Sequence, residues 1–255
     1  MIKLIAMRQL RNSIFMLVIL LANLSARSAA DAVSAASTLA PSPAIVIGLV
    51  GGYVSHDNLI HSEVSLAADL AKEYPTGVYV AAFENHRGKE AYKQILKLLD
   101  TNQDGKLSAE EKQQARIILY GHSWGASEAV SLARHLGQDG IPVLLTIQVD
   151  SVAKKGQDDA LIPANVAEAV NFYQTDGYLK GRAKIRAADP ARTQIIGNFQ
   201  SHYKESPLAC KKYPWWDHIF AKAHTQIECD PAVWNKVEAL IRAQLPPKST
   251  AASAQ

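Results

Sequence analysis

The chemically most informative segment of the chain is a serine between two glycines, in residues 121–125 (GHSWG). A β-rich run at residues 116–120 precedes it, and a helix-forming segment at 123–136 follows it. A G-x-S-x-G motif between a strand and a helix predicts a sharp turn, with the serine strained at its tip and the glycines allowing close backbone approach. The first N–H groups of the helix would lie beside Ser123. We therefore expect Ser123 to act as a nucleophile in acyl transfer.

In this setting the motif resembles the nucleophile elbow of the α/β-hydrolase superfamily, most closely its lipase- and esterase-like members with a GHSxG elbow. The resemblance covers residues 44–245; the elbow is its specific part, and the rest is the order and spacing of the elements. It implies a serine hydrolase in which the acid and then the histidine follow the nucleophile along the chain. It also implies that the histidine lies in a loop between the last strand and a C-terminal helix.

His224 fits that position, because it stands in the sequence AHTQIECDP directly before the predicted final helix. A terminal loop can fold back over the sheet edge and bring a general base to the serine hydroxyl. His202 and His218 are also late in the chain. His218 is the main rival, and its alternative role is packing or a surface hydrogen bond. We favour His224 as the general base.

Two aspartates compete for the role of the acid that orients the imidazole. Asp150 ends the apolar strand predicted at residues 142–149, and Asp176 follows the strand predicted at 169–173. Both would lie at the carboxyl edge of the sheet, where ligands bind in open α/β folds. Most α/β-hydrolases place the acid after the later strand, which suits Asp176, whereas some lipases place it one strand earlier. The more rigid position of Asp150 favours it slightly, and Asp176 is the alternative.

The oxyanion of an acyl-transfer intermediate needs two N–H donors. One would be the backbone N–H of Trp124, the residue after the nucleophile. The other is expected from the glycine-rich loop after the first strand, through the N–H of Tyr53 or Gly52. Glycines in that loop let the backbone approach a substrate closely, although such a sequence is also common in turns that bind nothing.

Residues 100–111 (DTNQDGKLSAEE) match the EF-hand calcium-loop pattern at every constrained position. Side-chain oxygens, one backbone carbonyl and a closing bidentate glutamate would surround a structural Ca²⁺. The predicted ligands are Asp100, Asn102, Asp104, the carbonyl of Lys106, Ser108 directly or through water, and Glu111. A helix capping box and ordinary turn chemistry account for parts of this segment, but not for its full register. The sequence indicates no organic cofactor.

The first 30 residues predict a secretory signal peptide: basic residues, the apolar run 14–22, and the small residues 28–30. The apolar run is too short for a membrane span, which needs about 20 residues, so no transmembrane anchor is expected after cleavage. We expect export to a periplasm or the extracellular space. The pair Cys210 and Cys229 then predicts a disulfide rather than a metal site.

The composition is that of an ordinary globular protein, and it excludes the disordered and collagen-like classes. The 255 residues are 48% hydrophobic and 20% charged, which is ordinary for one domain with a sizeable core. The predicted signal peptide holds four of the 27 basic residues and none of the 24 acidic ones, which leaves a net charge of −1. No basic tract remains to suggest nucleic acid as a partner. The expected partner is a small-molecule or lipid ester.

The elements that must position these residues alternate between strand-like and helix-like patterns. Strands are expected at residues 44–50, 77–83, 116–120, 142–149, 169–173 and 193–197, and helices at 61–73, 89–99, 123–136 and 231–245. This alternation predicts an α/β fold with a mostly parallel sheet covered by helices on both faces. The domain would span residues 44–245, between a disordered leader at 31–43 and a disordered tail at 246–255.

The sequence therefore predicts an exported serine hydrolase that cleaves a carboxylic ester of a lipid or a short-chain acid, with a thioester or an amide as other possible substrates. The main alternative is a catalytically inactive exported calcium-binding protein on a hydrolase scaffold. A calcium sensor is a third possibility, and the single calcium loop argues against it.

Overall fold

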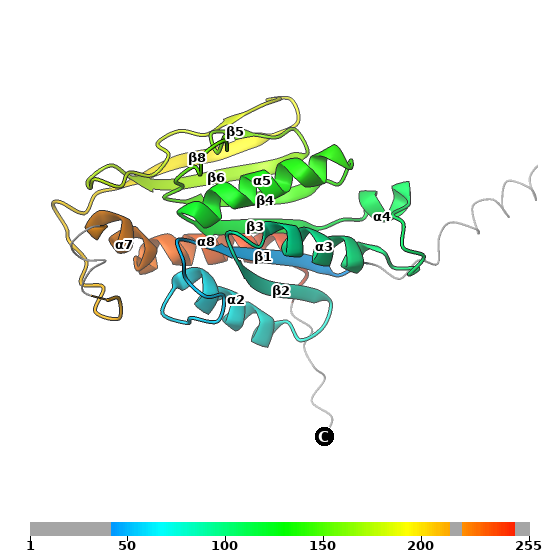
Figure 1. The fold of residues 1–255 in the computed structure, drawn as a ribbon, viewed down its shortest axis with the longest axis horizontal. Helices are drawn as coiled ribbons and strands as arrows, with labels where there is room; N and C mark the ends of the chain where they lie inside the picture. Colours follow the sequence, from blue (N-terminus) through cyan, green and yellow to red (C-terminus); the bar gives the residue numbers. More distant parts are fainter. Residues whose placement is uncertain (1–41, 215–220, 248–255) are drawn as a thin grey trace, which may run out of the picture. The chain divides into compact units, whose positions relative to one another are not determined.

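The structure is a computed structural model that describes residues 42–214 and 221–247 (Figure 1). The predicted signal peptide, almost all of the predicted leader, His218 and most of the predicted tail lie outside the described residues. Within the described ranges, no helix is both long and apolar enough to cross a lipid bilayer.

A six-stranded sheet forms the centre of the fold, and its strand order is β2-β1-β3-β4-β6-β8. Every neighbouring pair in this sheet is parallel, so the predicted fold class is confirmed. The short strands β5 (Leu161–Ile162) and β7 (Arg186–Ala187) pair separately. The strands of the main sheet are β1 (Ala44–Val50), β2 (Val78–Glu84), β3 (Ile117–His122), β4 (Val143–Val149), β6 (Val166–Gln174) and β8 (Gln194–Ser201).

Helices cover both faces of the sheet, and each face has its own apolar core (Figure 1). Helices α2 (Ser62–Glu73) and α8 (Pro231–Gln244) pack on one face, and α3 (Gly88–Leu99) and α5 (Trp124–Gln138) pack on the other. Because side chains alternate along a strand, β1 sends Val46 into one core and Ile45 and Ile47 into the other. This two-sided burial explains why β1 is an uninterrupted apolar run.

The predicted strands and long helices are confirmed, with ends that differ by a few residues. The structure adds β5, β7 and the short helices α4 (Ala109–Gln113) and α7 (Lys222–Glu228). Two-residue strands are too short to produce a periodic signal. In α7, six consecutive residues from Ala223 to Glu228 are buried although four of them are polar, so burial in this helix does not follow the apolar periodicity by which a helix is recognised.

The strand order reverses at β1, because β2 pairs with one edge of β1 and β3 pairs with the other. In open α/β sheets such a switch point leaves a crevice at the carboxyl ends of the strands, and ligands bind there. Ser123 follows β3, and the glycine-rich loop at residues 51–53 follows β1. The topology alone thus brings the predicted nucleophile and the predicted oxyanion loop to one crevice.

Candidate active site

Ser123 lies at the tip of a strained turn between β3 and α5. Its φ of 57° and ψ of −124° lie outside the regions that non-glycine residues ordinarily adopt. Its N–H donates to the carbonyl of Val149 at 3.0 Å, which ties the turn to β4. A Cβ at Gly125 would lie 1.9 Å from the Leu49 carbonyl oxygen, so only glycine allows the start of α5 to pack so closely on β1.

His224 contacts Asp150 and not Asp176. The Nδ1 of His224 lies 2.6 Å from Oδ2 of Asp150, whose side chain is fully buried. An ionised carboxylate only accepts hydrogen bonds, so Nδ1 carries the proton in this contact and Nε2 is left available as a base. Asp150 is itself fixed by Gln174, whose backbone N–H and side-chain Nε2 donate to it at 2.9 and 2.7 Å.

Asp176 has a different task at the end of the neighbouring strand. Its carboxylate accepts hydrogen bonds from the backbone N–H groups of Tyr203 at 2.6 Å and Lys204 at 3.2 Å. The hydrogen bond from Tyr203 is the main reason that the pKa of Asp176 lies below its ordinary value. Asp176 therefore holds the chain after β8.

The prediction that His224 lies in a loop is wrong, because His224 lies in the short helix α7. The sequence resembled a loop because residues 223–228 show no amphipathic pattern, yet all six are buried. The predicted disulfide between Cys210 and Cys229 is present, with Cα atoms 5.9 Å apart. Cys229 is the C-cap of α7, so the disulfide ties the end of the helix that carries His224 to the preceding segment.

A pocket of about 510 Å³ brings the predicted site residues together. Ser123 and His224 line it together with Trp124 and the loop at residues 51–54. Tyr53 is 94% exposed at its mouth, and its ring meets that of Trp124 edge to face at 5.6 Å. A hollow of about 580 Å³ lies at the amino ends of β4 and β6, but no serine, histidine or carboxylate lines it.

The loop after β1 is held rigidly against Ser123. A Cβ at Gly51 would lie 3.0 Å from the Cβ of Ser123, so the loop backbone passes directly beside the serine. The Gly51 N–H donates to Oε1 of Glu63 at 3.2 Å, and the side chain of Asn85 donates to the carbonyls of Val50 and Gly52. The N–H of Gly51 is therefore in use, which leaves those of Gly52 and Tyr53 as the predicted donors.

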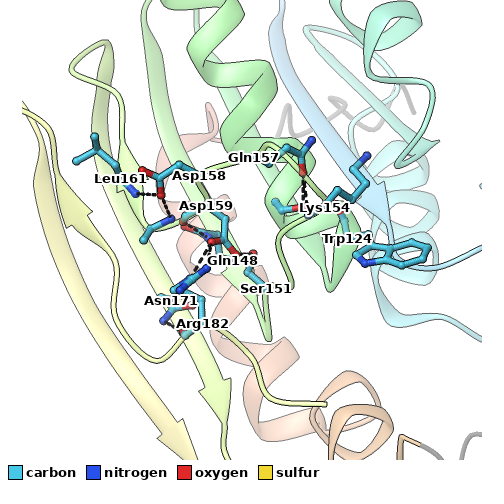
Figure 2. Close-up of polar contacts among 12 residues, drawn as sticks. Trp124, Gln148, Ser151, Lys154, Gln157, Asp158, Asp159, Leu161, Asn171 and Arg182 are labelled. Atoms are coloured by element: carbon cyan, nitrogen blue, oxygen red, sulfur yellow. Dashed lines mark hydrogen bonds and ion pairs between the residues drawn. The ribbon is translucent and has the colours of Figure 1, made fainter. Parts of the chain in front are cut away.

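A polar network fixes the segment that follows Asp150, and it could not be recognised in the sequence (Figure 2). The buried carboxylate of Asp159 accepts a hydrogen bond from Ser151 Oγ at 2.7 Å and pairs with Arg182 at 2.7 Å. The Arg182 backbone N–H donates to the Ser151 carbonyl, and Gln148 donates to the Asp159 carbonyl. Because Arg182 lies 23 residues beyond Asp159, no local motif connects them.

His122, the residue before Ser123, is a further residue of the candidate site that sequence reasoning missed. It is buried, and its ring lies 4.4 Å from that of His224, centroid to centroid. Burial and then the neighbouring His224 lower the pKa of His122 well below its ordinary value, so it stays neutral. A neutral ring at this position would not repel a proton on His224, which the predicted role of general base requires.

The predicted calcium loop joins α3 to α4, as an EF-hand loop joins two helices. The side-chain oxygens of Asp100 and Asn102 both accept the N–H of Asp104, at 3.1 and 2.9 Å, so they lie on the inside of the loop. Glu111 accepts the N–H of Thr101 and of Ser108, each at 2.9 Å, which brings the two ends of the loop together. The hydrogen bond from Ser108 is the main cause that lowers the pKa of Glu111 to about 2.

The loop also contains the capping box that the sequence offered as another explanation: Ser108 accepts the N–H of Glu111, and the Glu111 side chain accepts that of Ser108. Both oxygens of Glu111 accept hydrogen bonds within the loop, Oε2 from the Ser108 N–H and Oε1 from the backbone N–H and hydroxyl of Thr101. The inward-facing oxygens of Asp100 and Asn102 are those that the loop pattern assigns to Ca²⁺.

Comparisons with known proteins identify no family. No family model matches the chain, and no curated protein matches it. Among solved structures, it is similar to the RedJ thioesterase from the prodiginine biosynthetic pathway in Streptomyces coelicolor, at 10% identity and a TM-score of 0.40, over 83% of this chain and 96% of that one. A structure of RedJ with a PEG molecule bound in the active site matches with a TM-score of 0.38 at 10% identity, over 74% and 92%. Because both TM-scores are at or below 0.40, these similarities do not support an inference about function. We infer function from the site itself.

Proposed function

We propose that the chain is an exported serine hydrolase of the α/β-hydrolase type that cleaves a carboxylic ester of a lipid or a short-chain acid. The observation that carries this proposal is the joint placement of Ser123, on a strained turn, and His224, bonded to a buried Asp150, in the wall of one pocket. Nucleophile, base and orienting acid come from three segments that are far apart in the chain, and acyl transfer needs these three roles together.

In the proposed reaction His224 Nε2 takes the proton of the Ser123 hydroxyl while its oxygen attacks the ester carbonyl. Asp150 holds the imidazole in the required tautomer and stabilises its charged form. The tetrahedral intermediate then collapses: the bond to the alcohol oxygen breaks, and His224 gives its proton to the leaving alcohol. Water attacks the acyl-enzyme in the same way, and the acid is released as Ser123 recovers its proton.

Backbone groups would stabilise the negative oxygen of that intermediate. Trp124 is the first residue of α5, where a helix N–H has no partner within the helix and faces outward with the positive end of the dipole. Gly52 or Tyr53 would supply the second donor from the loop after β1, which lines the same pocket. Loss of one such donor typically lowers kcat by about 10²–10³.

A fluorophosphonate probe tests this function, because it forms a covalent bond only with an activated serine. We expect the wild-type chain to be labelled at Ser123, and we expect Ser123→Ala and His224→Ala to lose the labelling. Ser131→Ala is the matched control, since Ser131 is a buried serine whose hydroxyl donates to the Ser127 carbonyl within α5 rather than to a histidine. Folding of each variant is checked by circular dichroism.

Labelling must be measured with and without Ca²⁺, since the calcium loop precedes the nucleophile strand in the chain. Wild-type protein that resists the probe under both conditions would defeat the hydrolase proposal. That result would favour the alternative, a catalytically inactive calcium-binding protein on the same scaffold.

We also propose that Asp100, Asn102, Asp104, Lys106, Ser108 and Glu111 hold a structural Ca²⁺. The ion would neutralise the carboxylates of the loop and tie α3 to α4. It takes no part in the reaction above, and its contribution would be to the stability of the segment that leads into β3.

Calcium should raise the melting temperature of the purified chain. At a concentration 100 times the Kd, binding to the native state adds about 2.7 kcal/mol, which corresponds to roughly 5–10 °C for a domain of this size. Glu111→Gln should abolish the shift, because the amide keeps the capping box but loses the charge of the closing ligand. The matched control is Glu110→Gln, the exposed neighbour, which should respond as the wild type does. A wild-type melting curve that is indifferent to chelator would rule the site out.

A further inference from the structure

A second cluster of ionisable side chains that could bind a metal ion lies beside the pocket that contains Ser123. His61 and Glu63 come from the start of α2, and Glu228 comes from the end of α7. All three residues are buried, and one ligand atom from each lies within 4.8 Å of those of the other two. His61 and Glu228 also line the pocket that contains Ser123. The proposed hydrolysis uses none of these three side chains.

The two carboxylates of this cluster are buried, so a positively charged group is expected to balance them. Two carboxylates are buried close together, and buried carboxylates in proteins are paired, protonated or bound to a metal. Glu228 contacts His61, and its other oxygen lies 3.5 Å from Nδ1 of His122. Glu63 is fully buried; one of its oxygens accepts the Gly51 N–H, and the other has no hydrogen-bond partner in the described part of the chain.

Two carboxylates this close together repel each other in a buried site, and among the three side chains only His61 can carry a balancing positive charge. A divalent cation would balance both carboxylates and give the unpartnered oxygen of Glu63 a ligand to bind.

We propose that His61, Glu63 and Glu228 bind one divalent transition-metal ion, for which Zn²⁺ is the best candidate. One imidazole nitrogen and two carboxylate oxygens form a ligand set that suits Zn²⁺. Atoms bound to one tetrahedral Zn²⁺ at about 2.1 Å lie about 3.4 Å apart, so the three side chains must draw together from separations of at most 4.8 Å. Three protein ligands leave a further coordination position, as in zinc sites that also bind water or another small ligand.

Such an ion would connect two segments of the candidate site, the loop after β1 and helix α7. Glu63 also holds Gly51, in the loop beside Ser123, and Glu228 lies one helical turn from His224 in α7. The metal would thus fix the loop and the helix against each other, so its residues are positioning residues. The site differs from the calcium loop, whose ligands are all oxygen atoms, since it includes an imidazole. Binding here does not depend on the proposed hydrolase activity.

Direct metal binding tests the proposal. The full chain, prepared without a histidine tag and stripped with chelator, is titrated with Zn²⁺ by calorimetry in excess Ca²⁺, which occupies the calcium loop. We expect one Zn²⁺ per chain and a higher melting temperature when it is bound. Co²⁺ is a second probe, since its visible spectrum reports nitrogen and oxygen ligands.

Two variants locate the ion. Glu63→Gln keeps the shape of the side chain and an acceptor for the Gly51 N–H, and it should weaken Zn²⁺ binding at least 100-fold. His61→Gln should also weaken binding and should change the Co²⁺ spectrum. Glu111→Gln, in the calcium loop, should leave the Zn²⁺ affinity unchanged.

Wild-type protein that binds no Zn²⁺ would overturn the proposal, whether or not either variant folds. Zn²⁺ affinity that survives both substitutions would overturn it as well, because the ion would then bind elsewhere, for example at His224. A failure of the hydrolase proposal is recognised separately, by the absence of probe labelling in protein that does bind Zn²⁺.

Discussion

Replacement of Asp150 by asparagine is expected to lower kcat by about 10⁴ while the fold is retained. The asparagine side chain has the same shape and can still accept the N–H of Gln174. Its amide, however, presents either an N–H to His224 or an oxygen without charge. The first places the proton on the wrong nitrogen of the imidazole, and the second does not stabilise the imidazolium that forms as Ser123 attacks. Steady-state hydrolysis of a chromogenic ester measures the effect.

Asp176→Asn is the matched control for this prediction, since both substitutions remove one carboxylate at the same edge of the sheet. The amide that replaces the Asp176 carboxylate would keep an oxygen for the N–H groups of Tyr203 and Lys204. We expect a modest loss of stability and little change in kcat. The opposite pattern, a large loss of kcat in Asp176→Asn and a small one in Asp150→Asn, would contradict the assignment of the acid.

Gly181→Ala is expected to lower kcat by about 10², although residue 181 is neither the proposed nucleophile nor the proposed base. A Cβ at this position would lie 1.9 Å from Oδ1 of Asp150 and 2.7 Å from its Cα. The second contact is with backbone, which a change of rotamer cannot relieve. Asp150 must therefore shift, and it cannot move without losing its alignment with Gln174 or with His224. Measurement of kcat together with the melting temperature separates this displacement from general unfolding.

Gly177→Ala provides the control within the same segment. A Cβ there would meet the Cβ of Ala223 at 3.4 Å, an ordinary van der Waals contact. We expect this variant to keep its kcat and its stability. Equal activity of Gly181→Ala and wild type would show that Asp150 tolerates displacement, and it would weaken the role given to that residue.

Several features of the fold and site could be predicted from local sequence because they depend on local physics. The inner strands β1, β3 and β4 are largely apolar, since they are buried on both faces, and the amphipathic helices repeat at helical spacing. The turn at Ser123 needs its two glycines within five residues. The calcium-loop pattern is equally local, since all its predicted ligands lie within twelve residues.

Only the tertiary structure decided between the two acids, because Asp150 and Asp176 both follow strands that end at the same edge of the sheet. The lateral position of α7 determines which carboxylate His224 reaches, and that position depends on packing of the whole chain. The cluster of His61 and Glu228 joins residues 167 positions apart, and the contact of Gly181 with Asp150 likewise has no local signature. The sequence by itself singled out Ser123 as the proposed nucleophile, because its motif is local, whereas long-range packing decided which residues surround that serine.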